Sequence, residues 1–243
     1  MRGETTIGSE LLDDPRADPV AVGKELHDIA RLNALFGGTR AVVAALDTVF
    51  RAARDAGCET RDARWTLLDI GTGAGDIPRA AVAAAARYGI TLSPIGVEVI
   101  PAAARLARRS GVAAVIADAN APPLAPKSVD VVTVSQVLHH LPRAAAVRCI
   151  RACDVLARRL VVLADLRRSR VAMAGVWAAC IGLGMDRVTR HDAVLSLRRG
   201  YTRGELNAML EEAGAPVVAT YRPGFRIVAA WEPRPARDVH AHR

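Results

Sequence analysis

The sequence predicts an α/β fold: a Rossmann-like three-layer α/β/α sandwich whose seven-stranded, mostly parallel sheet ends in an antiparallel hairpin. Two observations lead to this prediction. From Trp65 to Leu166, short apolar runs alternate with helical segments, which is the order of parallel strands and their crossover helices. Beyond that stretch, two further runs stand close enough to pair around the turn Arg222-Pro223-Gly224. In such folds the ligand binds beyond the carboxyl ends of the parallel strands.

Each expected strand is a short apolar run. The five runs before the hairpin are Trp65–Ile70, Leu92–Val97, Val112–Ala117, Val129–Val134 and Leu160–Leu166, and the hairpin strands are Pro216–Tyr221 and Phe225–Trp231. Between them we expect helices at Asp76–Tyr88, Pro101–Arg109 and Arg143–Leu156. A last helix begins at Thr202, where TRGE predicts a capping box with Glu205, and ends at Gly214.

Two segments flank this core. Residues 1–55 predict an N-terminal helical segment that caps the cofactor or substrate, interrupted at Phe36-Gly37-Gly38-Thr39. Residues 56–235 then form the main domain. Within it, about 169–201 predicts a lid, made of an apolar helix over Ser169–Met185 and a basic loop after it. Residues 236–243 are expected to be a flexible tail.

The net charge of +8 raises the question of a nucleic-acid partner. Only Lys24 and Lys127 are lysines, so arginine supplies almost all of the positive charge, and the arginines are scattered rather than gathered in one segment. Aromatic residues make up 4% of the chain, which leaves few side chains for base stacking. The sequence therefore disfavours nucleic acid as the partner.

The sequence also gives expectations for the cellular location of the protein and for the oxidation state of its cysteines. The N-terminus lacks a basic segment followed by an apolar stretch, and the longest apolar run, Val171 to Met185, is short for a membrane span. Cys58, Cys149, Cys153 and Cys180 form no CxxC pair, so we expect reduced cysteines. We expect a cytoplasmic protein without membrane insertion, either a monomer or a homodimer.

The turn after the first strand carries the most specific signal, LLDIGTGAGDIP. Glycines at every second position let the chain turn sharply and let a ligand approach the backbone. The dinucleotide fingerprint would need its third glycine one residue later. Here Asp76 follows Gly75, and a carboxylate at the helix start would repel a pyrophosphate. A ligand with positive charge suits this turn better, and Asp69 suits an ammonium group.

This turn resembles motif I of the class I S-adenosylmethionine-dependent methyltransferases. Three further segments appear in the order typical of that family: IGVEVIP, VIADANAPPL and SVDVVTVSQVLHHLP. The resemblance extends over about Asp55 to Asp165 and points to the small-molecule, UbiE/type-11-like branch. It implies S-adenosylmethionine as cofactor and S-adenosylhomocysteine as product.

The resemblance also implies the residues that hold the cofactor. Glu98 would accept hydrogen bonds from the ribose hydroxyls, although a ribose of NAD makes the same demand. Asp118 would hold the adenine amino group, or it is only a turn aspartate before Pro122-Pro123. The full set expected at the cofactor is Asp69, Gly71, Thr72, Gly73, Gly75, Asp76, Glu98, Val99, Asp118, Ala119 and Ser135.

Methyl transfer from a sulfonium needs alignment of the acceptor and, for a hydroxyl acceptor, a base. Histidine is the natural base near neutral pH. His139 and His140 follow the fourth strand, and His191 lies in the segment after the apolar helix; these are the candidate catalytic residues. A purely structural role for the pair His139-His140 stays open, because family members carry similar sequences there without acid–base roles.

The lid predicts the kind of acceptor. Its apolar helix favours a flat, apolar molecule over a sugar, although ordinary packing or a dimer interface explains the same composition. We expect Gln136, Arg167, Trp177 and Tyr201 to contact the substrate. No second acid cluster resembles the magnesium site of catechol-type methyltransferases, so we expect no metal.

The sequence thus predicts an enzyme, a methyltransferase that O-methylates a small phenolic or polyketide-like acceptor, as in secondary metabolism. Three alternatives remain open: C-methylation of a quinone-type ring, an RNA-binding methyltransferase or module, and a methyltransferase fold that has lost transfer.

Overall fold

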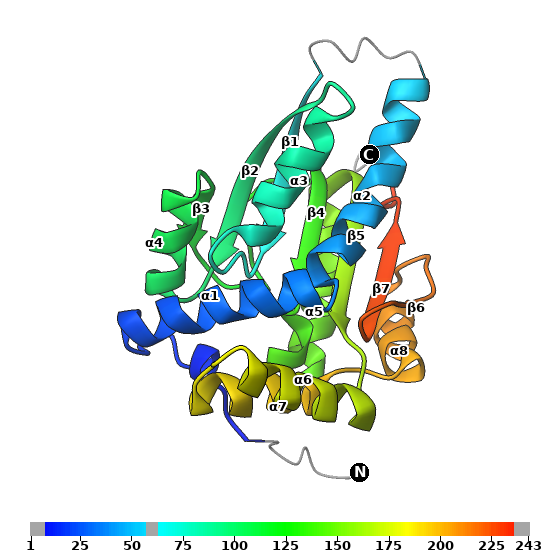
Figure 1. Ribbon diagram of the computed structural model, residues 1–243. Helices are drawn as coiled ribbons and strands as arrows, with labels where there is room; N and C mark the ends of the chain where they lie inside the picture. Colours follow the sequence, from blue (N-terminus) through cyan, green and yellow to red (C-terminus); the bar gives the residue numbers. More distant parts are fainter. Residues whose placement is uncertain (1–7, 57–62, 236–243) are drawn as a thin grey trace.

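The computed structural model describes residues 8–56 and 63–235 and has the predicted architecture (Figure 1). Its seven strands run in the order β3-β2-β1-β4-β5-β7-β6. They are β1 (Arg64–Ile70), β2 (Thr91–Glu98), β3 (Ala113–Ile116), β4 (Val129–Ser135), β5 (Ala157–Leu166), β6 (Thr220–Arg222) and β7 (Arg226–Trp231). The first five are parallel, and β7 pairs antiparallel with both β5 and β6. The α/β sandwich and its terminal hairpin are therefore confirmed.

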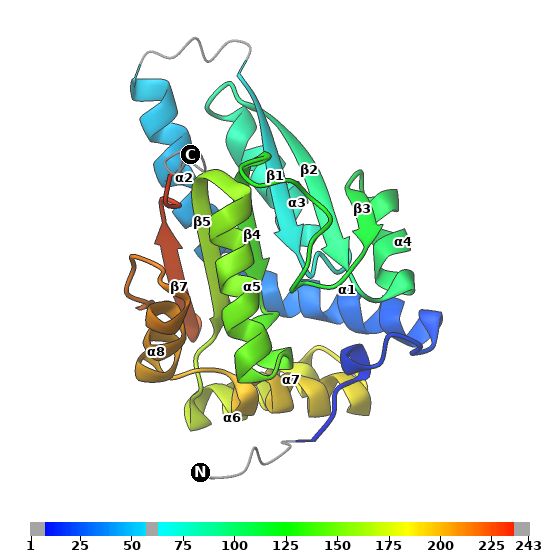
Figure 2. The same cartoon turned by 180° about the vertical axis from the view of Figure 1, so that it is seen from behind.

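Helices cover both faces of the sheet. The helices are α1 (Pro19–Leu35), α2 (Gly38–Asp55), α3 (Asp76–Ala86), α4 (Pro101–Arg109), α5 (Arg143–Leu156), α6 (Arg170–Gly182), α7 (Arg187–Arg199) and α8 (Arg203–Ala213), with short 3-10 helices η1 (Leu11–Asp13) and η3 (Leu138–His140). Figure 1 shows α2 and α3 in front of the sheet, and Figure 2 shows α5 and α8 on the other side.

Successive side chains of a strand point to opposite faces of the sheet, so each strand contributes residues to two hydrophobic cores, one on each face. Leu67 of β1 packs with Phe50 of α2 and the alanines of α3. Its neighbour Leu68 packs with Ile150 of α5 and Leu210 of α8. The central strands are buried from both sides, as parallel strands in this architecture are.

A third group of helices closes one end of the sheet. In both views α1, α6 and α7 lie across the end toward which the parallel strands point (Figures 1 and 2). The break between α1 and α2 is at Gly37, whose φ of 71° suits glycine. The N-terminal segment therefore has two roles: α1 covers the carboxyl edge of the sheet, whereas α2 belongs to a side layer.

The segment 186–201 is where the secondary structure departs from expectation. We predicted a basic loop, but Arg187–Arg199 forms α7. The side chain of Asp186 caps it by accepting a hydrogen bond from the Thr189 amide. The first hairpin strand is also shorter than predicted, since only Thr220–Arg222 pairs. The tail 236–243 and Cys58 lie outside the described residues.

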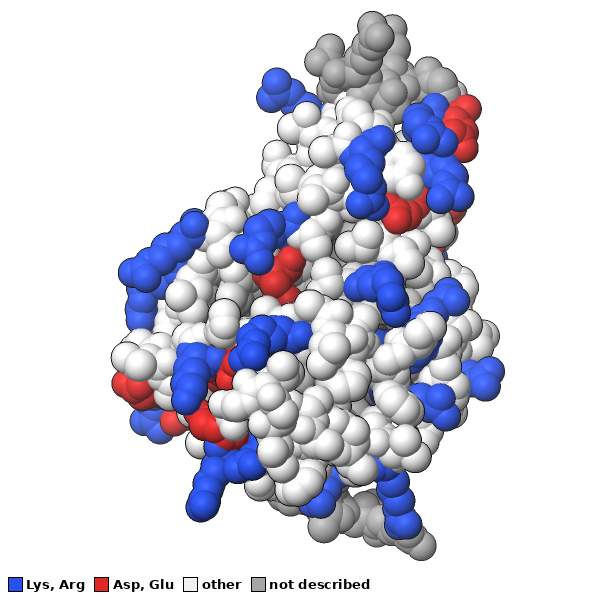
Figure 3. All heavy atoms as spheres, viewed as in Figure 1, with Lys and Arg blue, Asp and Glu red and all other residues white. Residues whose placement is uncertain are grey.

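The surface agrees with the scattered arginines of the sequence. On the face seen in Figure 3, lysine and arginine side chains are spread out and interrupted by acidic ones. Several exposed arginines are in ion pairs, among them Arg87 with Asp47 and Arg143 with Glu212. Among the described helices, none is by itself long and apolar enough to cross a membrane, although the bent pair α1 and α2 passes that test together.

Candidate active site

A cavity of about 430 Å³ lies between the carboxyl edge of the sheet and the covering helices α1, α6 and α7. It has two parts. One part follows the ends of β1, β2 and β4, and we call it the cofactor lobe. The other lies among η1, η3, α1, α6, α7 and the start of β7, and we call it the acceptor lobe. All but one of the expected cofactor residues line the cavity: Asp69, Gly71, Thr72, Gly73, Asp76, Glu98, Val99, Asp118, Ala119 and Ser135.

The glycine turn forms the floor of the cofactor lobe. Gly71, Gly73 and Gly75 have φ values of 69°, 53° and 81°, in the left-handed region that side chains disfavour. A Cβ on Gly71 would collide with Val137. Gly75 does not line the cavity, and a Cβ there would lie 2.9 Å from Val112 Cγ2. Gly75 therefore serves the close approach of the turn to the α4–β3 connection, whereas Gly71 and Gly73 border the ligand space.

Asp69 gives the cofactor lobe a buried acid. Its side chain accepts a hydrogen bond from Thr133 Oγ1 at 2.6 Å, and the residue is 2% exposed. Burial raises the pKa of Asp69 to about 7. The side chains of Thr133 and Thr72 lower this pKa, whereas repulsion from Asp76 and Glu98 raises it further. A cationic ligand beside this carboxylate would stabilise its ionised form.

Glu98 sits at the end of β2 and holds the turn. Its Oε2 accepts a hydrogen bond from the Gly73 amide at 2.9 Å, and its Oε1 accepts one from the Ile100 amide at 3.0 Å. Each carboxylate oxygen can accept a second hydrogen bond, so the pair suits two neighbouring hydroxyls. Asp118 lies on the rim, where its Oδ1 accepts bonds from the Asn120 amide and side chain. That turn leaves Oδ2 for a ligand amine.

The polar side chains of the cofactor lobe also fit S-adenosylmethionine. Thr72 lines the lobe with its hydroxyl buried; that oxygen lies near the Asp69 carboxylate and lowers its pKa, but it forms no hydrogen bond of good geometry with any described residue. A buried polar atom without a partner is costly, so its position at a ligand cavity favours a polar ligand. Four acids line this lobe, namely Asp69, Asp76, Glu98 and Asp118. They favour a cationic nucleoside over a diphosphate.

Comparison of the sequence with known protein families agrees with the geometry of the cofactor lobe. Residues 68–158 match a family model described as a methyltransferase domain. Over these residues the chain carries a methyltransferase domain of the class I S-adenosylmethionine-dependent type. It is thus an enzyme whose cofactor is S-adenosylmethionine, and the resemblance of its glycine turn to motif I is confirmed. No curated protein matches the sequence significantly.

Solved structures share the fold of this methyltransferase. A SAM dependent methyltransferase from Aquifex aeolicus is 14% identical, with 79% of this chain and 98% of that chain covered and a TM-score of 0.50. The S-adenosylmethionine-dependent methyltransferase SibL in its apo form is 20% identical, with 70% of this chain and 50% of that chain covered, also at 0.50. At these identities the likeness shows the fold alone.

The acceptor lobe of the methyltransferase has apolar walls. The cavity is lined by one apolar cluster: Leu32 of α1, Phe36 just after it, Ala172 and Val176 of α6, Leu197 of α7 and Phe225 before β7. Helix α6 therefore forms part of the wall through its inner face. This composition suits a flat or apolar acceptor.

A histidine–aspartate pair borders the same lobe. Nδ1 of His139 lies 2.6 Å from Oδ1 of Asp165, and both side chains are almost fully buried. Burial opposes ionisation of Asp165, but His139 and the Leu166 amide outweigh it and hold the pKa of Asp165 below its usual value. An ionised carboxylate only accepts hydrogen bonds, so Nδ1 carries a hydrogen, and in the neutral imidazole the lone pair is on Nε2. Nε2 has no partner among the described residues.

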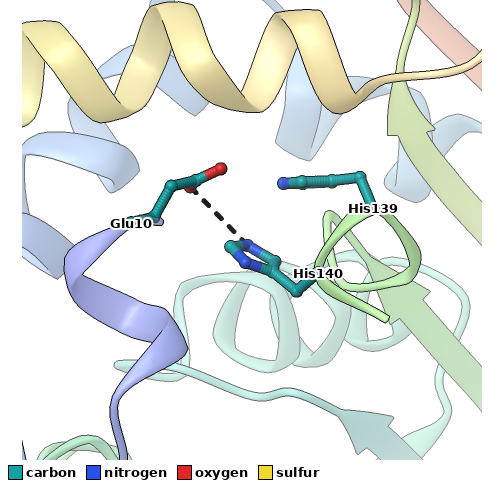
Figure 4. Close-up of side chains that lie close together, drawn as sticks. All are labelled: Glu10, His139 and His140. Carbon is teal, nitrogen blue, oxygen red and sulfur yellow. Dashed lines mark ion pairs between the residues drawn. The ribbon is translucent and has the colours of Figure 1, made fainter. Parts of the chain in front are cut away.

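His140 turns to different partners. Its Nδ1 lies 2.8 Å from Asp13 Oδ1 and its Nε2 lies 3.9 Å from Glu10 Oε2. Figure 4 shows Glu10 on one side, with the nitrogen of His139 pointing toward it and the ring of His140 below both. The ligand atoms of Glu10, His139 and His140 lie within 4.8 Å of one another, close enough for a metal ion.

The partners of Glu10 argue against a metal in that cluster. Its Oε2 accepts the Ser196 hydroxyl at 2.6 Å, and its Oε1 accepts the Arg199 guanidinium at 3.1 Å. A guanidinium so close would repel a second cation. Burial raises the pKa of Glu10, although His140, Ser196 and Arg199 act in the opposite direction. The expectation of a metal-independent enzyme stays a prediction.

Four of the expected catalytic or substrate residues do not line the cavity. His191 is exposed on α7, where its neighbour Asp192 faces inward. Trp177 is 53% exposed on the outer side of α6. Arg167 stacks over the Tyr221 ring at 4.1 Å, and Tyr201 donates its hydroxyl hydrogen to the Leu138 carbonyl at 2.8 Å. Gln136, by contrast, lines the cavity as expected.

Other residues of the site were not singled out from the sequence. Glu10, Asn33, Asp192 and Arg226 line the cavity, and Asp165 holds His139 from outside it. Asp165 lies in the carboxyl-terminal part of its strand, as Asp69 and Glu98 do in theirs, and an acid at the carboxyl edge of the sheet was a usable signal. Glu10 and Arg226 reach the cavity only through the folding of distant segments, and no local pattern marks them.

Proposed function

We propose that this methyltransferase O-methylates a small, largely apolar acceptor with a hydroxyl of phenolic type. The observation that carries the proposal is the buried pair His139–Asp165, whose free Nε2 borders an apolar lobe next to the cofactor lobe. We assign the cofactor to Asp69, Gly71, Thr72, Gly73 and Glu98, with Asp118 at the adenine.

The pair acts as a base and its positioning group. Bound S-adenosylmethionine supplies an electrophilic methyl group. His139 Nε2 accepts the proton of the acceptor hydroxyl as the oxygen becomes nucleophilic. Asp165 keeps the ring in the right tautomer and stabilises the imidazolium that forms. Positioned general bases of this kind contribute about 10²- to 10⁴-fold to the rate.

The apolar walls of the acceptor lobe exclude water and align the acceptor. Leu32, Phe36 and Val176 exclude water from the acceptor oxygen and hold a flat ring against η3. Since alignment alone supplies a large part of the rate in such displacements, a well-shaped apolar lobe is part of the catalytic apparatus.

The test is a panel of phenols, catechols and quinols incubated with S-adenosylmethionine that carries a ¹³C-labelled methyl group. Nuclear magnetic resonance of the products shows whether the label sits on oxygen or carbon. Methoxy products from the wild type, reduced at least about 100-fold in His139→Gln, support the proposal. A label on a ring carbon would overturn O-methylation. His139 would then still remove the hydroxyl proton, but the resulting phenolate would react at carbon. An RNA substrate would instead show binding that falls steeply with salt.

A further inference from the structure

Arg226 is a buried cation without a direct counter-ion. It opens β7, is 4% exposed and lines the cavity. One terminal nitrogen donates a hydrogen bond to Gln136 Oε1 at 3.0 Å and the other to Asn33 Oδ1 at 3.4 Å. Nε has no partner among the described residues, and no carboxylate of the described part of the chain forms an ion pair with this guanidinium. Buried charges are normally paired, so this arrangement calls for an anion.

The charges around Arg226 keep it positive. Burial lowers the pKa of Arg226 to about 10, while the negative charge of Asp165 opposes that effect, so the side chain is charged at neutral pH. Asp165 does not pair with it directly: its Oδ1 is engaged by His139 and the Leu166 amide, and its Oδ2, which has no hydrogen-bond partner among the described residues, forms no ion pair with this guanidinium.

The surroundings favour one side for the anion. Arg226 pairs in register with Leu166 and follows Phe225, and both of these residues form the apolar wall of the acceptor lobe. On the other side, Asn33 reaches toward the Asp76 carboxylate, with Nδ2 3.4 Å from Oδ2. An anion therefore lies better between Arg226 and the apolar wall than beside Asp76.

The backbone holds Arg226 in this position. A Cβ on Gly224 would collide with the carbonyl of Phe36, so the β6–β7 turn packs directly on the end of α1. Gln136 has a φ of 56°, and its Nε2 donates to Asn33 Oδ1 at 2.6 Å. The hydrogen-bonding groups are therefore preorganised.

We propose that Arg226, Gln136 and Asn33 form a carboxylate-binding subsite, and that the acceptor of this methyltransferase carries the carboxylate. The guanidinium offers a planar pair of donors to a carboxylate, and the Gln136 amide fixes its orientation. The acceptor is then a hydroxylated aromatic acid. The assignment of the carboxylate to the acceptor rests on the proposed O-methylation. The cofactor also carries a carboxylate, on its methionyl group, and the test distinguishes the acceptor carboxylate from the cofactor carboxylate.

The first arm measures acceptor binding by titration calorimetry on the protein saturated with S-adenosylhomocysteine. The probes are the three hydroxybenzoate isomers and the three matching hydroxybenzamides. At least one acid binds about tenfold or more tightly than its amide, and Arg226→Gln removes the difference whereas Arg226→Lys keeps part of it. The matched control is Arg222→Gln, an exposed arginine of the same hairpin.

The second arm measures the cofactor side with S-adenosylhomocysteine and 5′-methylthioadenosine, which lacks the carboxylate. If Arg226→Gln weakens only the former, and acids bind no better than amides, the cofactor is the source of the carboxylate. If neither arm depends on Arg226, the subsite is overturned. Should Arg226→Gln fail to fold, the acid–amide comparison on the wild type and Arg226→Lys decides. Acids that bind through Arg226 but are never methylated would refute O-methylation and leave the subsite intact.

Discussion

His140 and Asp13 join two segments of the chain that lie 127 positions apart. Nδ1 of His140 is 2.8 Å from Oδ1 of Asp13, and Arg199 of α7 reaches the same aspartate at 2.9 Å. Burial opposes the ionisation of Asp13, but the bonds from His140 and Arg199 prevail and hold its pKa below the usual value. These contacts fasten η1 over the acceptor lobe. The two consecutive histidines thus have separate partners and, in our account, separate roles.

The first prediction concerns this division. His140→Gln should lower the rate of methyl transfer less than about tenfold and leave the pH profile unchanged, because the variant alters a hydrogen bond to Asp13 and leaves the base in place. The measurement is single-turnover transfer with saturating cofactor, beside a melting curve. A loss of about 100-fold or more in a folded His140→Gln protein would move the base from His139 to His140.

The second prediction concerns pH and cofactor affinity. Asp69 has a pKa of about 7, raised above its ordinary value by burial, so it is mostly protonated in acid. Only the ionised form attracts the cationic cofactor, so affinity should rise with pH up to about 7 and level off above it, with release of a proton on binding. Calorimetry in buffers of different ionisation enthalpy counts that proton. Asp69→Asn should bind weakly and without this pH dependence; a flat profile in the wild type would place the cation elsewhere.

The third prediction concerns the glycine turn. Gly73→Val places a branched side chain at a φ of 53° beside Leu26, at the border of the cofactor lobe. Titration with S-adenosylhomocysteine should show no binding. Gly204→Val is the matched control, since a Cβ at Gly204 on α8 meets nothing within 4 Å. Normal affinity in Gly73→Val would mean that the cofactor lobe has been misplaced.

The fourth prediction concerns Glu98. Glu98→Gln keeps one acceptor oxygen but loses the charge and the second acceptor, so the dissociation constant should rise about 10- to 100-fold. The variant also weakens the bond to the Gly73 amide, so its melting temperature must be compared with that of the wild type. A control ligand is adenine, which lacks the ribose: its affinity should stay the same. Equal losses for both ligands would indicate a damaged turn instead of lost ribose contacts.

Much of the fold could be predicted because its signals are local. The strand Trp65–Ile70 is apolar and is followed by glycines, and TRGE forms the expected capping box at Thr202. Helix α7 escaped prediction because much of its inward side is polar. Thr189, Ser196 and Arg199 bond to Glu25 or Glu10, and Asp192, on the same side of the helix, accepts a hydrogen bond from the Leu11 amide. Hydrophobic periodicity does not register such a helix, although the capping residue Asp186 was visible.

The cofactor lobe could be predicted from the sequence, whereas most of the acceptor lobe could not. The residues assigned to the cofactor follow strands within one contiguous stretch, so motif order was enough to select them. The acceptor lobe is assembled from η1, α1, α7 and β7, which the chain brings together only on folding. His191 was selected for its chemistry, yet a shift of one helical position turns it outward and Asp192 inward.

The central claim is that His139, held by Asp165, removes the proton from the acceptor. It is tested most directly by the rate of single-turnover methyl transfer in His139→Gln and Asp165→Asn, on an acceptor found in the labelled screen. The account predicts a fall of about 100-fold or more in His139→Gln, a smaller fall in Asp165→Asn, and an unchanged dissociation constant for S-adenosylhomocysteine in both. A His139→Gln enzyme within about twofold of the wild-type rate, with its cofactor affinity intact, would contradict it.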